Sequence, residues 1–121
     1  MNLSSEQILT ATKVNRYFFY RLFKVGNRPT DEQLTRVGID VDAVKEEADT
    51  TGRQPTWSTP RFVLEIARFQ SGLLDLEEDG ICGPLTAKRI QELSATAYEL
   101  ILNGKRVPIG RRVISYTEPN G

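Results

Sequence analysis

In the first third of the chain, segments with apolar residues at helical spacing alternate with polar segments. The segments with helical spacing follow capping signals. Ser4 precedes Gln7 by three residues, and Thr30 precedes Gln33 by three residues, which is the capping-box pattern of a helix start. Gly38 then supplies a typical helix end. The sequence therefore predicts one helix that begins after Ser4 and another that runs between Thr30 and Gly38.

An aromatic-dense block, residues 17–23 (YFFYRLF), follows the first predicted helix and is closed by Gly26 and Pro29. We expect this block to be helical and to provide core for a helical N-terminal part that packs on the rest of the chain. The other interpretation is a surface wedge that inserts into a partner or a membrane. A further helix is predicted over residues 42–49, and residues 50–58 have the turn composition of a connector.

The middle of the chain uses one type of helix start twice, a threonine or glycine followed by proline. Thr59 is a good N-cap and Pro60 suits the first helical position, while Gly83 and Pro84 open a second helix in the same way. Gly72 ends the first of these helices. Apolar positions at helical spacing mark the predicted inward faces: Phe62, Val63, Ile66, Ala67 and Phe69 in the first helix, and Leu85, Ile90, Leu93 and Ala97 in the second.

The C-terminal segment changes character. Residues 98–102 and 105–109 flank Asn103 and Gly104, a pattern that predicts a β-hairpin with a primed turn. Residues 113–116 are predicted to form one more strand.

Length and composition agree with one compact domain, or with a small module that has appended helices. The chain has 121 residues, and its 39% hydrophobic and 26% charged content is that of an ordinary globular protein. The predicted fold class is mainly α. We expect a helical N-terminal extension over residues 1–57, a small helical module over residues 58–97, and a short β-hairpin with a tail or linker over residues 98–121.

The charge balance narrows the choice of partners. Lys and Arg number 16 and Asp and Glu number 16, so the formal net charge is zero. General nucleic-acid binding and membrane-surface binding rely on an excess of basic residues, and we expect neither partner. No apolar run approaches the roughly 18 residues of a membrane span, and the N-terminus lacks the features of a signal peptide. We therefore expect cytoplasmic synthesis without a signal peptide.

Residue types that many enzymes and metal sites use are absent from the sequence. Because there is no histidine, Ser-His-Asp triads, Cys-His dyads and His-ligated zinc sites are excluded. The single Cys82 can form neither an internal disulfide nor a structural metal site, and we expect it to be a small buried apolar residue. The sequence therefore predicts no metal and no cofactor.

Residues 61–94 carry the most specific pattern of the chain. In this stretch Phe69–Gln70 is followed by Gly72–Leu73, by the run DGICGPLT over residues 79–86, and by the apolar stripe of residues 90–93. The stretch resembles the peptidoglycan-binding domain found beside many bacterial and phage cell-wall hydrolases. It differs from that family at Cys82, where an aromatic residue is frequent, at Leu93–Ser94, where Phe-Gln is frequent, and in a slightly longer loop after Gln70.

The run over residues 79–86 also has an explanation in backbone geometry alone. Asp79–Gly80 predicts a tight turn, since glycine accepts a positive φ. Ile81 is expected to point inward as an anchor between the two helices. Gly83 lets the chain bend closely into the next helix, where Pro84 fixes φ without the loss of a needed donor. We expect these residues to serve mainly for shape.

The resemblance implies non-catalytic binding of peptidoglycan, by its glycan strand or its stem peptide, which concentrates a murein hydrolase on the bacterial cell wall. A bacteriophage lysis protein of the endolysin type is the expected source. A catalytic hydrolase domain is the expected partner, because residues 102–109 resemble segments that join such modules to hydrolases. Sugars stack on aromatic rings, and Arg pairs with the carboxylates of stem peptides. Candidate ligand-binding residues along a shallow groove between the two helices are Arg68, Phe69, Gln70, Asp79, Gly80, Ile81, Gly83, Thr86 and Arg89, with Trp57 as a flanking platform.

Other interpretations stay open on the sequence. Phe69 also fits a core position, and Trp57 also fits a seal of the helix pair. Residues 33–48 have the spacing of a helix-turn-helix nucleic-acid binder, but the second helix is acidic and would repel phosphates. A small acid–base glycosidase acting on murein needs only two carboxylates. Its candidates, each of which also fits a solvated helix position, are Glu32, Glu46, Glu47 and Glu65.

Overall fold

The computed structural model describes residues 3–24, 26–52 and 55–102, and for residues 97–102 it describes the backbone alone. The described part is built from helices and contains no strand, which confirms the mainly α fold class. In chain order the elements are α1 (Ser5–Tyr17), the π-helical turn η1 (Phe18–Leu22), α2 (Asp31–Arg36), α3 (Val41–Thr51), the 3-10 turn η2 (Thr56–Ser58), α4 (Pro60–Gln70) and α5 (Pro84–Leu102).

The predicted capping signals explain where these helices begin. The Ser4 hydroxyl accepts a hydrogen bond from the Gln7 N–H at 3.1 Å, and Thr30 accepts one from the Gln33 N–H at the same distance. In both cases the glutamine side chain accepts from the backbone N–H of the cap residue, so both capping boxes are complete. Thr59 caps α4 through the Phe62 N–H at 3.3 Å. The predicted starts of α1, α2 and α4 are confirmed.

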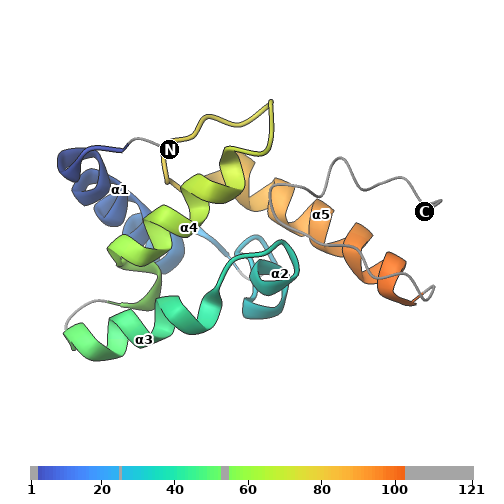
Figure 1. The fold of residues 1–121 in the computed structure, drawn as a ribbon, viewed down its shortest axis with the longest axis horizontal. Coiled ribbons are helices and arrows are strands. Elements are labelled where there is room, and N and C mark those ends of the chain that lie inside the picture. Colours follow the sequence, from blue (N-terminus) through green and yellow to red (C-terminus); the bar gives the residue numbers. More distant parts are fainter. Residues whose placement is uncertain (1–2, 25, 53–54, 103–121) are drawn as a thin grey trace.

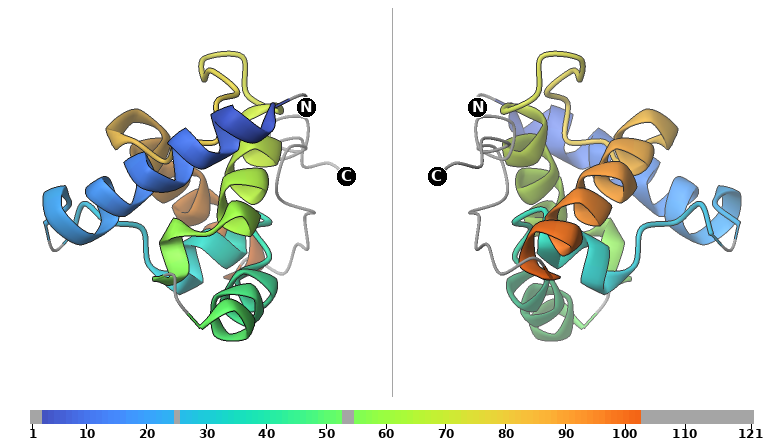
Figure 2. Two further views of the ribbon diagram at one scale, coloured as in Figure 1. Left: turned by 90° about the vertical axis from the view of Figure 1, so that its left-hand side faces the viewer. Right: turned by 90° about the vertical axis from the view of Figure 1, so that its right-hand side faces the viewer.

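Helix α4 packs against elements that precede it in the chain (Figure 1). α1 packs across α4, and α3 contacts α4 together with η2. α2 packs against α5, and the views of Figure 2 show α5 on the side of the molecule away from α1's first turns. The loop of residues 71–83, at the top of Figure 1, connects α4 to α5. The arrangement places this loop beside the N-terminal end of α1.

An aromatic cluster joins the N-terminal part to α4. The ring of Phe19 from η1 lies 5.3 Å from that of Phe62 and 5.8 Å from that of Trp57, and the Trp57 and Phe62 rings are 5.0 Å apart. All three side chains are buried in one core cluster. Aromatic pairs of this kind contribute about 0.5–1.5 kcal/mol each beyond their area burial. The aromatic block is therefore helical and supplies core, as expected, and Trp57 seals this core rather than forming a surface platform.

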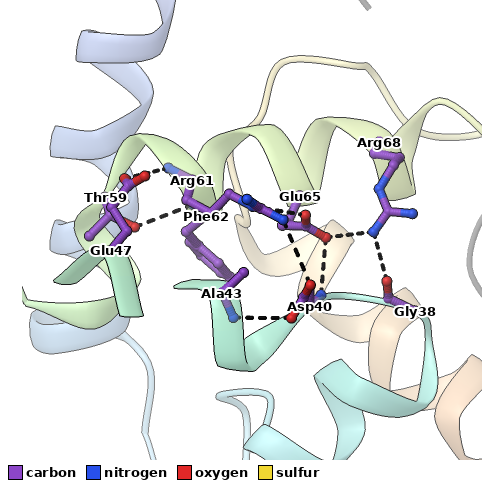
Figure 3. A network of polar contacts seen from close by, with 9 residues as sticks. All are labelled: Gly38, Asp40, Ala43, Glu47, Thr59, Arg61, Phe62, Glu65 and Arg68. Carbon is purple, nitrogen blue, oxygen red and sulfur yellow. Dashed lines mark hydrogen bonds and ion pairs between the residues drawn. The ribbon is translucent and has the colours of Figure 1, made fainter. Parts of the chain in front are cut away.

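A polar network attaches α4 to the turn that joins α2 and α3 (Figure 3). One oxygen of the buried Glu65 carboxylate accepts from the Asp40 N–H at 3.0 Å and from the Arg68 guanidinium at 2.5 Å. The other oxygen accepts from Nε of Arg61 at 3.1 Å, and Arg68 also donates to the Gly38 carbonyl at 2.8 Å. Burial raises the pKa of Glu65, but the Asp40 N–H and the two guanidinium groups outweigh it and hold that pKa below its ordinary value.

The predicted C-terminal hairpin is wrong in its first strand. Residues 98–102 continue α5, which extends to Leu102. The remaining hairpin residues, 103–109, and the predicted strand 113–116 lie outside the described residues. Within the described part of the chain, no helix has the length and apolar character that a membrane crossing requires.

Candidate functional site

Gln70, the last residue of α4, organises the turn that carries the family-like motif. Its carboxamide oxygen accepts from the backbone N–H groups of Asp79 and Gly80 at 3.0 and 2.8 Å. Its amide nitrogen lies 3.0–3.1 Å from the Asp79 carboxylate, the Ile81 carbonyl and the Thr86 hydroxyl. The side chain is 2% exposed, so these contacts satisfy it inside the protein. One glutamine thus ties the end of α4 to the turn and to the first turn of α5.

Asn15 of α1 holds the same turn from the opposite side. Its side-chain amide donates to the Gly80 carbonyl at 3.1 Å, and its carboxamide oxygen accepts from the Cys82 N–H at 2.7 Å. Asn15 is fully buried. Asn15 was not predicted from the sequence, although a signal exists there: it is a polar residue at helical spacing between Ala11 and Phe19, both of which are buried.

Glycine is required at position 80 rather than at position 83. Gly80 has φ +75°, and a Cβ there would lie 2.6 Å from Cγ1 of Val63 and 3.1 Å from the Val63 carbonyl oxygen. A Cβ at Gly83 would lie 3.5 Å from the Phe18 ring, which is ordinary van der Waals contact. The predicted Asp79–Gly80 turn is confirmed, whereas the expectation that Gly83 permits an unusually close bend is wrong.

Cys82, and not Ile81, is the buried anchor of the turn. Cys82 is fully buried within the main core cluster, as expected for a small apolar residue, whereas Ile81 is partly exposed. Burial raises the pKa of the Cys82 thiol far above its ordinary value. The thiol therefore stays protonated, which makes it a poor nucleophile.

Several of the predicted ligand-binding side chains lie inside the protein. Phe69 and Gln70 are each 2% exposed, Thr86 is 5% exposed, and Gly80 is also buried. The expected furrow along these side chains is therefore filled by the protein itself, because Gln70 occupies the space between the end of α4 and the start of α5. Asp79, Ile81 and Gly83 keep partial exposure.

The two candidate arginines lie apart from this cluster. Arg68 faces the α2–α3 turn through Gly38 and Glu65, as Figure 3 shows. Arg89 forms ion pairs with Asp75 at 3.2 Å and with Glu92 at 3.1 Å. The structure thus brings together Gln70, the turn and Thr86, but gives each arginine acidic partners elsewhere.

Two grooves open on either side of the motif turn. One has a volume of about 430 Å³ and lies between the first turns of α1 and the loop, lined by Leu3, Glu6, Gln7, Thr10, Glu77, Glu78, Asp79 and Ile81. The second has a volume of about 360 Å³ and lies between η1, the chain that follows it, and the start of α5. We call it the η1–α5 groove, and it is lined by Leu22, Phe23, Asn27, Pro84, Lys88 and Gln91. Both volumes lie within the range of small-ligand sites.

α2, the turn after it and α3 have the order of elements that the alternative interpretation, a helix-turn-helix nucleic-acid binder, requires. A groove of about 480 Å³ is lined mainly by α2, the turn and the start of α3. The side chains of Asp42, Glu46 and Asp49 are exposed on α3, and Lys45 is paired with Asp31 at 2.6 Å. Such a surface is unfavourable for phosphate.

Three of the four carboxylates named for the glycosidase alternative, those of Glu32, Glu47 and Glu65, are held by partners within the protein. A general acid of that kind needs a raised pKa, whereas the pKa of Glu65 is lowered by its partners. Glu32 pairs with Arg36 on α2, and Glu47 accepts from the Arg61 N–H at 2.9 Å. Over the described residues, no group of His, Cys, Asp and Glu is placed to hold a metal ion.

Comparison with known proteins adds no family assignment. No protein-family model, no curated protein and no solved structure matches the chain.

Proposed function

We propose that the chain is a non-catalytic module that binds bacterial peptidoglycan and positions a murein hydrolase on the cell wall. The proposal rests on the hydrogen bonds that the Gln70 side chain makes to residues 79–81 and to Thr86. The residues through which the sequence resembles peptidoglycan-binding domains, from Phe69–Gln70 to Thr86, form one hydrogen-bonded unit at the junction of α4 and α5. A motif that holds two helices in a fixed relation supports a binding surface of fixed shape beside it.

The binding surface lies around this unit and not within it. Phe69, Gln70 and Thr86 are enclosed, so the wall polymer would contact the side chains that border the turn. The η1–α5 groove begins at Pro84, inside the motif itself, and provides such a surface. Its polar side chains suit hydrogen bonding to an uncharged or anionic polymer.

A non-catalytic role accords with the environments of two residues that could otherwise be reactive. The Cys82 thiol is enclosed, and the carboxylate of Glu65 is engaged by Arg61 and Arg68. Cleavage of murein would then come from a separate catalytic domain, of the kind carried by phage lysis proteins that are made in the cytoplasm and act at the wall.

Sedimentation with purified, dye-labelled murein sacculi tests the proposal. We expect the full chain to pellet with the sacculi and to release no dye. Dye release would replace the proposal with the glycosidase alternative. A folded chain that stays in the supernatant at every sacculus concentration would refute peptidoglycan binding, and salt-sensitive retention on DNA in the same experiment would favour the helix-turn-helix alternative.

A further inference from the structure

The η1–α5 groove combines an apolar floor with one cation and two carboxamides. Leu22, Phe23 and Pro84 supply the apolar surface, and Leu22 remains 45% exposed although it is a large hydrophobic residue. Lys88, Asn27 and Gln91 supply the polar groups. The Gln91 amide nitrogen donates to the Gly26 carbonyl at 2.9 Å, which fixes this side chain across the groove. A lining of this kind, mainly apolar with a few placed polar groups, is typical of a small-ligand site.

The charge around the groove favours an anionic ligand. Lys88 is exposed and has no ion-pair partner among the residues that the structure describes. Lys88 follows Pro84 by one helical turn, so its ammonium group adds to the positive end of the α5 dipole. Arg21 and Lys24, next to Leu22 and Phe23 in the chain, are exposed as well. No acidic side chain lines this groove, whereas four line the groove beside α1.

Phe23, the aromatic residue in the lining of the groove, already packs against two other rings. Phe23 stacks on Phe18 with centroids 5.6 Å apart and an interplanar angle of 26°. Phe19 meets Phe23 edge-on at 5.4 Å. A sugar ring needs an open aromatic face on which to stack, and the Phe18 ring already occupies one face of Phe23. The groove is therefore better suited to a peptide with small apolar side chains than to a glycan strand.

We infer that the η1–α5 groove binds the carboxylate-terminated stem peptide of peptidoglycan. Lys88 pairs with the terminal carboxylate, Asn27 and Gln91 bond to the peptide amides, and the apolar floor covers the methyl groups of alanine residues. This inference rests on the proposed function, since it names the part of the wall that the module recognises. The glycan strand is the competing occupant.

Titration of the full chain with soluble wall fragments, followed by NMR or calorimetry, tests the inference. The probes are a synthetic stem pentapeptide with a free C-terminal carboxylate, the same peptide with an amidated C-terminus, and a peptide-free glycan fragment. We expect the free-acid peptide to bind about tenfold more tightly than the amidated one, since charge-assisted hydrogen bonds are the stronger kind. Equal binding of the two peptides, or binding of the glycan fragment alone, would overturn the inference.

Matched lysine variants locate the interaction. Lys88→Gln should weaken binding of the free-acid peptide about tenfold and should leave binding of the amidated peptide unchanged. Lys13→Gln, at an exposed lysine of α1 that does not line the groove, should change neither. Unchanged binding by Lys88→Gln would overturn the inference, and thermal melting of each variant excludes loss of folding as the cause.

The two proposals can fail separately. Pelleting with sacculi without binding of the stem peptide would overturn the groove assignment and leave peptidoglycan recognition standing. Binding of the free-acid peptide without pelleting would leave the groove assignment standing and overturn the wall-targeting function.

Discussion

Substitution of Gly80 by alanine tests the closest contact in the motif turn. Gly80 combines a positive φ with a backbone path that approaches α4 at Val63. A methyl group at this position would need to stand 2.6 Å from a Val63 side-chain carbon and 3.1 Å from the Val63 carbonyl oxygen. Neither neighbour moves freely, because Val63 is buried and its branched side chain is stiff on a helix.

The expected loss of folding stability in Gly80→Ala has two parts. An L-residue in the left-handed region costs about 1–2 kcal/mol, and forcing an extra carbon into a packed interior costs about 1–3 kcal/mol. Gly80→Ala should therefore lower the free energy of unfolding by about 2–5 kcal/mol, which corresponds to a fall in Tm on the order of 10 °C for a chain of this size. Gly83→Ala is the matched control. Its added carbon would meet the Phe18 ring at an ordinary 3.5 Å, so we expect a change within about 1 kcal/mol.

Thermal and urea unfolding, followed by circular dichroism, measure both variants against the parent chain. A melting temperature of Gly80→Ala within a few degrees of the parent would show that residue 80 does not approach α4 in solution as described. A large loss in Gly83→Ala together with a small one in Gly80→Ala would reverse the assignment of the required glycine.

Three further predictions concern buried side chains. Asn15→Ala should lower the free energy of unfolding by about 2–4 kcal/mol, since it leaves the Gly80 carbonyl and the Cys82 N–H without their partner. Urea titration measures the loss. A change below about 0.5 kcal/mol would contradict a stabilising role for these two hydrogen bonds. The pKa of Glu65 is lower in the folded than in the unfolded chain, so the stability from this group is present above its ordinary pKa of 4.5 and is lost as the pH falls through the lowered value. Melting temperatures at decreasing pH should therefore fall more steeply for the parent chain than for Glu65→Gln, and parallel curves would exclude this contribution. Cys82 should resist alkylation in the folded protein and react fully in urea, and fast labelling of the native chain would show that the thiol is accessible.

Local signals explain most of what the sequence predicted correctly. The starts of α1, α2 and α4 depend on cap residues and on partners three residues away, so a short window contains all the necessary information. The predicted strand at residues 98–102 failed for a related reason. A short apolar run suits a buried strand or a buried helix equally, and here it continues the hydrogen bonding of α5.

The site was predictable only where its members are neighbours in sequence. The Asp79–Gly80 turn followed from residue types alone, whereas the hydrogen bonds of Gln70 to this turn were not predicted. The clamp from Asn15 depends on tertiary packing across more than sixty residues. Arg68 and Arg89 each pair with an acid three residues away on the same helix, a spacing that is visible in the sequence. Their contacts with the Gly38 carbonyl and with Asp75 depend on tertiary packing, and the sequence does not contain them. Burial of Phe69 and Gln70 follows from the way α1 and the loop close over α4, and a pattern along the chain does not contain that information.

The clamp of Asn15 on residues 80 and 82 has a consequence for how the molecule assembles. α1 is synthesised early, yet its buried amide gains both of its partners only when the chain beyond α4 has emerged and turned back. Contacts so distant in sequence form slowly, since the entropy of closing a long loop precedes their gain. Until residues 80 and 82 have emerged from the ribosome, the Asn15 side chain has neither of these two partners. A ribosome-stalled chain that ends before residue 80 should accordingly be sensitive to protease, whereas the released protein is resistant.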